Sequence, residues 1–288
     1  MLFTTVEQLI NLAGSRKVNI SDIMIEQEMA SSEIDKETIY ENMLEQLRIM
    51  EQAVDRGLSE RLTSRSGLVR GDAKLLSEYS DTGRPLSGSL MTNAMAMSMA
   101  TAEVNACMGA VVATPTAGSC GVVPACILSA GNHFNSNRTE LVDALFAAGA
   151  IGLVIANNAS ISGAAGGCQA EIGSASGMAA AAVVQLAGGT PKQCADAVAI
   201  ALKSILGLVC DPVAGLVEIP CIKRNATGTS LAIVSADMAL AGIESAIPCD
   251  EVIDAMHRVG RSMPATLRET SMGGLATTET ARKIEKSI

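Results

Sequence analysis

The feature that most constrains the fold is a long region almost free of charge. From Leu90 to Asn137 the only Asp, Glu, Lys or Arg is Glu103, and from Ala144 to Pro191 the only one is Glu171. Segments such as "SGMAAAAVVQLAGG" are rich in small and apolar residues that favour helix and let helices pack closely. Strand signals are weak, because the Val and Ile runs are short and lie within Ala-rich stretches. The sequence therefore predicts an all-α fold, a compact multi-helix bundle with buried Ala/Gly-rich helices and cysteine-bearing loops.

The character of the chain changes near residue 87. Before this point the sequence is charged, and "KETIYENMLEQLRIMEQAVDRGL" places apolar residues at steps of three and four, as in an amphipathic helix. A chain of 288 residues is long enough to bury a substantial core. We expect residues 1–86 to form an amphipathic helical segment that packs on a helical catalytic core, 87–288, in one continuous domain.

The net charge and the length of the apolar runs argue against nucleic-acid and membrane partners. The net charge is −9 and only 2% of residues are aromatic, so the chain lacks the basic and stacking surface of a nucleic-acid binder. The longest uninterrupted apolar run, 144–156, has 13 residues, whereas a membrane span needs about 20. The start "MLFTTVEQLINLAGSRK" does not resemble a secretory signal. We therefore expect a cytoplasmic protein without nucleic-acid or membrane partners.

Seven of the eight cysteines divide into two groups by their neighbours, and Cys120 lies in the "ATPTAGSCG" segment. In a cytoplasmic protein they are expected to be buried thiols, metal ligands or catalytic groups rather than disulfide partners. Packing explains four of them, which lie where a small apolar residue would serve equally well: Cys107, Cys126, Cys194 and Cys249. Cys168 instead follows the glycine-rich "SGAAGG", and Cys210 and Cys221 bound the loop "CDPVAGLVEIPC". Their spacing matches neither a zinc nor a ferredoxin pattern, so a three-cysteine metal site and scattered buried thiols both remain open.

Two further sets of residues are candidates for chemistry. In "TPTAGS", the hydroxyl and glycine residues either bind an anion at a helix N-terminus or form an ordinary capped turn; they are Thr114, Thr116, Gly118 and Ser119. Glu103 and Glu171 are lone carboxylates in apolar surroundings, where burial suits them to proton transfer, or else each is paired. Lys203 is either a desolvated amine or a lysine that reaches solvent. His133 and His257 lie in polar segments, so we expect their side chains to be solvated.

Three motifs together carry a family resemblance. "ATPTAGSCGVVPA", "SGAAGGCQAEIGSASGMAAAA" and "CDPVAGLVEIPCIKRNA" resemble the α chain of the bacterial iron-sulfur L-serine dehydratases, and the likeness extends over essentially the whole chain. The resemblance implies that Cys168, Cys210 and Cys221 hold a 4Fe-4S cluster with one iron left open to act as a Lewis acid on the hydroxyl of L-serine. It also implies that the "TPTAGS" loop binds substrate.

The resemblance carries expectations about partners as well. Single-chain relatives have an additional N-terminal domain with an SSSHT-type motif, which does not occur here, so we expect a separate β chain in an oligomeric enzyme. Three alternatives remain: a threonine-preferring dehydratase, a pyridoxal-phosphate dehydratase, and a helical scaffold or regulatory subunit whose cysteines only pack. A pyridoxal-phosphate enzyme would need a Schiff-base lysine and a phosphate loop on an α/β scaffold, and the helical composition disfavours it.

Overall fold

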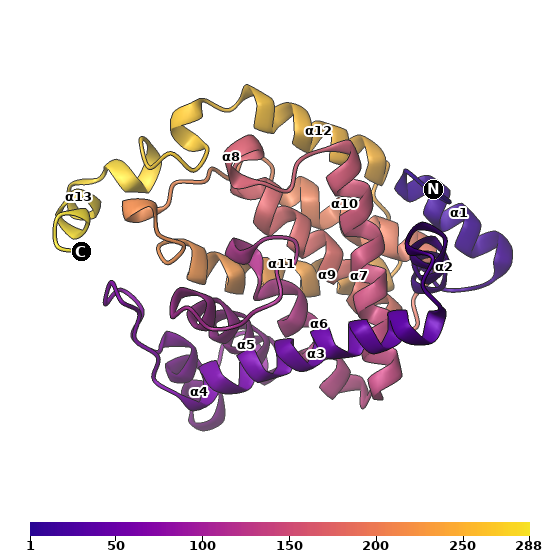
Figure 1. The fold of residues 1–288 in the computed structure, drawn as a ribbon, viewed down its shortest axis with the longest axis horizontal. Coiled ribbons are helices and arrows are strands. Elements are labelled where there is room, and N and C mark those ends of the chain that lie inside the picture. Colours follow the sequence, from indigo (N-terminus) through magenta and orange to yellow (C-terminus); the bar gives the residue numbers. More distant parts are fainter.

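The computed structural model describes all 288 residues and contains thirteen α-helices joined by short loops and turns (Figure 1). No β-strand occurs, and the only strand-like pairing is an isolated bridge between Cys210 and Arg268. The all-α prediction is confirmed. The α-helices are α1 (Val6–Arg16), α2 (Ile20–Ser32), α3 (Lys36–Ser59), α4 (Asp72–Thr82), α5 (Gly88–Ala106), α6 (Val122–Phe134), α7 (Arg138–Asn158), α8 (Gly163–Gly166), α9 (Ser174–Leu186), α10 (Pro191–Ser204), α11 (Cys221–Leu240), α12 (Cys249–Ser262) and α13 (Glu279–Glu285). Five short 3₁₀ or π-helical turns lie between them: η1 (Ala117–Ser119), η2 (Gln169–Gly173), η3 (Val213–Gly215), η4 (Ala265–Leu267) and η5 (Gly274–Thr277).

Helix α9 is the centre of the bundle. It packs against α6, α7, α10 and α11, which surround it in Figure 1. Its sequence "SASGMAAAAVVQL" is buried over Ser174–Val184, because small side chains allow neighbouring helices to approach from several directions. The charge-poor region is therefore the interior of the molecule, as its composition indicates.

The N-terminal helices share the core of the rest of the chain. Helix α2 packs on α7, α3 runs along the edge of the bundle against α5 and α7, and α4 packs on α5 (Figure 1). One buried cluster contains Phe3, Leu9 and Leu47 together with residues of α7 and α9. The carboxylate of Asp250, at the start of α12, accepts hydrogen bonds from the backbone N–H groups of Val6 and Glu7 at 2.8 and 2.9 Å. Because Asp250 is inside α12, it caps α1 rather than its own helix.

Helix α7 is long and apolar enough to cross a membrane by length and composition alone. In the structure it packs against α2 and α9, and 56% of its most apolar window is buried. Buried core helices meet the same criterion, so this feature is weak evidence for a membrane span.

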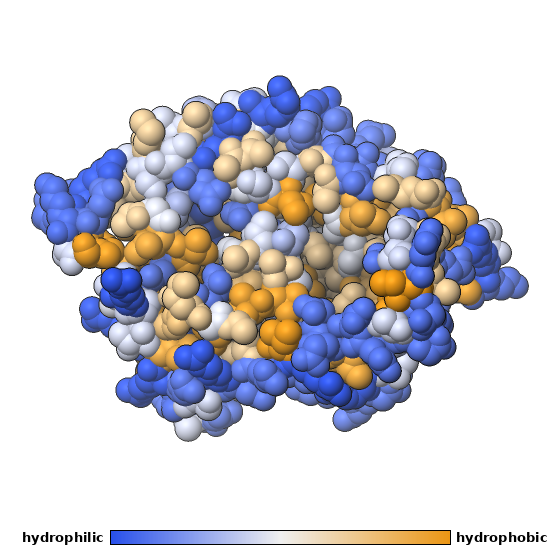
Figure 2. All heavy atoms as spheres, in the orientation of Figure 1, coloured by the Kyte–Doolittle hydropathy of each residue, from blue (hydrophilic) through white to orange (hydrophobic).

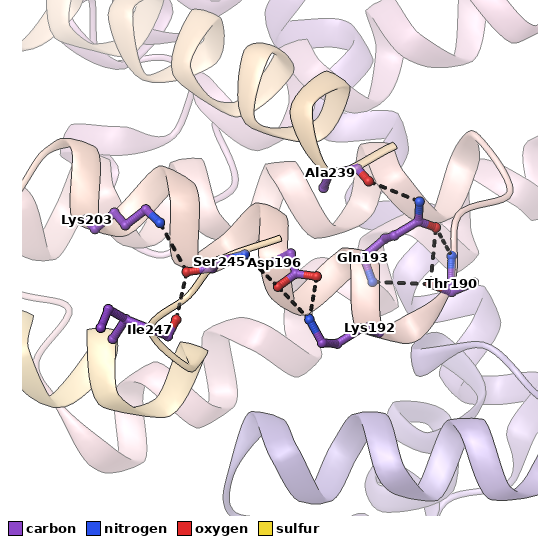
Figure 3. Close-up of polar contacts among 8 residues, drawn as sticks. All are labelled: Thr190, Lys192, Gln193, Asp196, Lys203, Ala239, Ser245 and Ile247. Atoms are coloured by element: carbon purple, nitrogen blue, oxygen red, sulfur yellow. Dashed lines mark hydrogen bonds and ion pairs between the residues drawn. The ribbon is translucent and has the colours of Figure 1, made fainter. Parts of the chain in front are cut away.

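The loop between α11 and α12 is held by polar side chains of α10 (Figure 3). Asp196 accepts from the backbone N–H of Ser245 at 3.1 Å and pairs with Lys192 at 2.7 Å. Lys203 donates to Ser245 Oγ at 3.1 Å, and that hydroxyl in turn donates to the carbonyl oxygen of Ile247. Lys203 is exposed, and its one hydrogen bond fixes this loop.

Close packing of α3 on α5 depends on Gly57. A Cβ atom placed there would lie 2.5 Å from the carbonyl oxygen of Ala100 and 2.6 Å from its Cα atom. We expect Gly57→Ala to lower the free energy of unfolding by about 1–3 kcal/mol, because α3 must move away from α5. Gly149→Ala is the matched control in α7: nothing lies within 4 Å of its added Cβ. It should be neutral or stabilise by up to about 1 kcal/mol through helix propensity. Urea unfolding of the two variants measures both effects, and equal behaviour would contradict this account of the α3–α5 contact.

Candidate functional site

Cys168 is placed by a run of small residues. It directly follows α8 and Gly167 and precedes the π-helical turn η2. Gly167 has φ +75°, and an added Cβ would lie 2.7 Å from Met263 Sδ and 2.8 Å from the carbonyl oxygen of Leu208. Glycine is therefore required here for both conformation and space. The glycine run lets the chain turn sharply in the interior, so that the Cys168 side chain is only 4% exposed.

Cys210 and Cys221 lie at the two ends of one loop, as the sequence predicts. The backbone of Cys210 pairs with the C-terminal segment: its N–H donates to Leu267 at 2.9 Å, and its carbonyl oxygen accepts from Glu269 at 2.7 Å. The loop turns at η3 and closes with a 2.8 Å hydrogen bond from Val213 N–H to the Ile219 carbonyl oxygen. Cys221 is then the first residue of α11.

Burial raises the pKa values of all three thiols, and the Glu171 carboxylate adds to the rise in each. Burial raises the pKa of Cys168 to about 11, and Arg224 offsets part of this rise. The pKa of Cys221 is raised to about 12 by burial and then by Cys168. Burial also raises the pKa of Cys210, with contributions from Glu171, Cys168 and Cys221. The thiols therefore lie in one neighbourhood, although no three His, Cys, Asp or Glu side chains are arranged as a ready metal-ligand set.

The "TPTAGS" loop faces this neighbourhood through one hydroxyl. Thr116 Oγ1 donates to Glu171 Oε1 at 2.8 Å, and a Cβ on Gly118 would lie 3.2 Å from the same oxygen. Thr114 and Ser119 are buried, and their hydroxyls donate within the loop, to the Cys120 and the Thr114 and Thr116 carbonyl oxygens. Of the four predicted loop residues, Thr116 and Gly118 border Glu171, whereas the other two hold the loop in shape.

Asn225 fastens this loop to the helix that begins at Cys221. Its side-chain oxygen accepts from Gly121 N–H at 2.9 Å, and its nitrogen donates to the carbonyl oxygens of Gly118 and Cys221 at 2.7 and 2.9 Å. The side chain is fully buried. The side-chain amide of Asn225 therefore fixes the relative positions of the loop, the start of α6 and the start of α11.

Glu171 connects the loop to the thiols. Its Oε2 lies 3.8 Å from Cys210 Sγ, while Oε1 accepts from Thr116. Burial raises the pKa of this carboxyl, and the hydrogen bond from Thr116 opposes the rise. The structure thus brings together residues from all three motifs that were singled out in the sequence.

The other two proton-transfer candidates lie in different surroundings. Glu103 Oε1 accepts from Ala73 N–H at 3.1 Å, so Glu103 stabilises the N-terminus of α4, whose N-cap Gly71 supplies no side chain. Burial raises the pKa of Glu103. Lys203 contacts only the loop after α11. Neither makes a hydrogen bond to the thiols, Thr116 or Glu171.

Three charged residues near the thiols were not anticipated from the sequence. Arg224 donates to the Val209 carbonyl oxygen at 2.8 Å and to Asp211 at 2.9 Å, and Asp211 also accepts from Leu275 N–H at 2.7 Å. Glu218, within the loop between Cys210 and Cys221, accepts from hydroxyl groups of the segment between α3 and α4. The only signal for them in the sequence is charge within a mostly apolar motif, "CDPVAGLVEIPCIKRNA".

The remaining cysteines are packing residues where the structure defines their contacts. Cys126 and Cys194 are fully buried in α6 and α10, and each sulfur donates to a backbone carbonyl oxygen. Cys249 is buried at the start of α12.

Comparison with known proteins places the chain among dehydratase subunits. The family model described as "Serine dehydratase alpha chain" matches residues 15–276. A probable L-serine dehydratase α chain from Bacillus subtilis is 58% identical over all of this chain and 95% of its own length. The L-serine dehydratase α chain from Peptoniphilus asaccharolyticus is 42% identical over all of this chain and 98% of its own. L-serine dehydratase 1 of Escherichia coli is 38% identical, and the match spans 95% of this chain but 61% of that longer protein. The site geometry and these matches agree: the chain belongs to the serine dehydratase α chain family.

Proposed function

We propose that the chain is the catalytic α subunit of an L-serine dehydratase, which converts L-serine to pyruvate and ammonium. The observation that carries the proposal is the position of Glu171, between Thr116 of the "TPTAGS" loop and the Cys210 thiol, in a member of this family. A substrate-binding loop, a proton acceptor and a set of metal-binding side chains are what an elimination from a hydroxy amino acid requires.

The thiols fit an iron-sulfur cluster by type, number and setting. Thiolates are the usual protein ligands of such clusters, and three of them leave one iron without a protein ligand. The thiols belong to separate segments: Cys168 follows a glycine-rich turn, Cys210 forms the isolated bridge, and Cys221 begins α11. Arg224, beside Cys168, favours the thiolate form of that residue. Ligation removes the thiol protons, so the high pKa values describe the metal-free protein. We propose that Cys168, Cys210 and Cys221 hold a 4Fe-4S cluster. When bound, the cluster supplies a Lewis acid for the hydroxyl group of serine.

The chain's own residues would bind and orient the substrate. Backbone N–H groups around Gly118, in the turn η1 that leads into α6, would provide hydrogen-bond donors for the substrate carboxylate, while the Thr116 hydroxyl holds Glu171. Glu171, held by Thr116 Oγ1, is the carboxylate best placed to accept the Cα proton of serine. The aminoacrylate released by the elimination tautomerises to an imine and hydrolyses to pyruvate and ammonium without further help.

Exposed apolar residues near the site suggest where a β chain would dock. Val217, in the loop between Cys210 and Cys221, is 37% exposed, and Met272 and Leu275 of the C-terminal segment are 66% and 43% exposed. Figure 2 shows apolar residues gathered at the end of the molecule where η3 and the C-terminal segment lie. Apolar surface of this kind marks protein interfaces. We propose that a β chain covers it in a cytoplasmic oligomer.

Anaerobic pyruvate formation from L-serine tests the proposal directly. The protein is reconstituted with iron and sulfide and assayed with and without a candidate β chain; we expect turnover that depends on iron and increases with the β chain. The absorption spectrum separates the mechanism from that of a pyridoxal-phosphate enzyme, because an iron-sulfur band is broad and bleaches in air. A reconstituted complex that binds iron and partner but forms no pyruvate would favour a scaffold or regulatory role.

A further inference from the structure

A polar pocket lies beside the segment that carries Cys168. It has a volume of about 350 Å³ and opens between α8 and α12, which run side by side at the top of Figure 1. Its floor is formed by Gly166 and Ala170, and none of the three candidate ligand cysteines lines it. Glu171, the next residue, instead contacts Thr116 and Cys210, so the pocket is separate from the proposed active site.

The polar lining of this pocket is cationic. Arg261 and His257 enter it from α12, Arg268 from the C-terminal segment, and Ser160 adds a hydroxyl group. No aspartate or glutamate lines it. Glu269 is adjacent to Arg268 in sequence, but its carboxylate is close enough to Cys210 and Glu171 to raise the pKa of both and does not reach the pocket.

The two arginines also lack acidic partners elsewhere. Neither forms an ion pair, whereas Arg258, one turn earlier on α12, pairs with Asp254 at 3.0 Å. Arg268 makes one side-chain hydrogen bond, a long 3.4 Å contact from Nη1 to the Ala165 carbonyl oxygen. Guanidinium groups without acidic partners keep donors for a bound oxyanion, and such charge-assisted hydrogen bonds are strong.

We propose that this pocket binds a small oxyanion, the carboxylate or phosphate group of a soluble metabolite. The planar guanidinium groups of Arg261 and Arg268 provide paired donors that match such a group, and Ser160 and His257 add further hydrogen-bonding atoms. The volume lies within the usual range of small-molecule sites. The pocket would bind such an anion whether or not the chain catalyses the proposed reaction.

Calorimetric titration of the full-length chain tests the site, with inorganic phosphate and malonate as probes and glycerol as a neutral control. We expect saturable binding of at least one anion and none of glycerol, and the tighter anion identifies the preferred oxyanion class. Arg261→Gln should weaken binding about 10- to 100-fold, the loss expected for charge-assisted hydrogen bonds. Arg258→Gln is the matched control, because it removes the same charge from the same helix outside the pocket, and its affinity should be unchanged.

Two results would overturn the proposal. One is the absence of saturable binding by either anion; the other is an equal loss of affinity in the Arg258 and Arg261 variants, which would indicate only general attraction to α12. Arg261 is exposed and makes no ion pair, so its variant should fold. The Arg261→Lys variant is a second test, because it keeps the positive charge but loses the paired donors of the guanidinium group. It should bind the anion with intermediate affinity.

Discussion

Single replacement of Cys168, Cys210 or Cys221 by alanine is expected to abolish stoichiometric iron binding and to lower serine turnover more than about 100-fold. Loss of a group that only supports a metal ligand typically costs 10- to 100-fold, so loss of a ligand should cost more. Iron and sulfide content after anaerobic reconstitution and pyruvate formation are the measurements. The three variants should behave alike, because their thiols lie in one buried neighbourhood.

Cys194→Ala is the matched control for these variants. Cys194 is as buried as Cys168 and Cys210, but its sulfur makes its one hydrogen bond to the Ala181 carbonyl oxygen in the helical core. This variant should be somewhat less stable and yet retain iron and activity. Full iron content in the three ligand variants would refute the cluster assignment, whereas iron loss in Cys194→Ala as well would indicate a general folding defect.

Replacement of Glu171 by glutamine is expected to reduce kcat about 100- to 10,000-fold while iron content stays at the wild-type level. The range is that of a lost general base, and the amide keeps the size and the hydrogen bond from Thr116 Oγ1. Steady-state kinetics beside iron analysis separates this effect from cluster loss. Glu171→Asp should retain more activity than the glutamine variant, since it keeps a carboxylate in the same position on the chain.

Glu103→Gln distinguishes a proton acceptor from a buried structural carboxylate. Glu103 accepts from the backbone at the start of α4, so its replacement should alter stability and leave kcat near the wild-type value. If Glu103→Gln lowers kcat as much as Glu171→Gln does, the assignment of the proton acceptor to Glu171 is wrong.

The fold class was predictable because the segments that form the interior are rich in alanine and poor in charged residues. The stretches 90–137 and 144–191 each hold one lone carboxylate among many small and apolar residues, a composition that favours burial. Helix α9 shows why, because its small side chains let helices pack against it from several sides. Helix caps supplied by residues that are distant in the sequence were not predictable. The Asp250 carboxylate binds the backbone of Val6 and Glu7, and a contact between residues so far apart leaves no local sequence pattern.

The candidate site residues that lie in motifs could be singled out from the sequence, whereas residues that connect one motif to another could not. The "TPTAGS" loop, Glu171 and the three thiols are each visible as local departures from an apolar background. Asn225 and Arg224 resemble ordinary residues at the start of a helix. Their roles arise only when folding brings the loop, Val209 and Asp211 beside α11.

The bridge between Cys210 and Arg268 also has a consequence for the order of biosynthesis. The backbone of Cys210 is fixed by Leu267 and Glu269, and Asp211 is held by Leu275. These partners are made by the ribosome well after the last of the three thiols. A nascent chain therefore cannot complete the backbone geometry at Cys210 until the segment that contains Leu267, Glu269 and Leu275 has emerged from the ribosome.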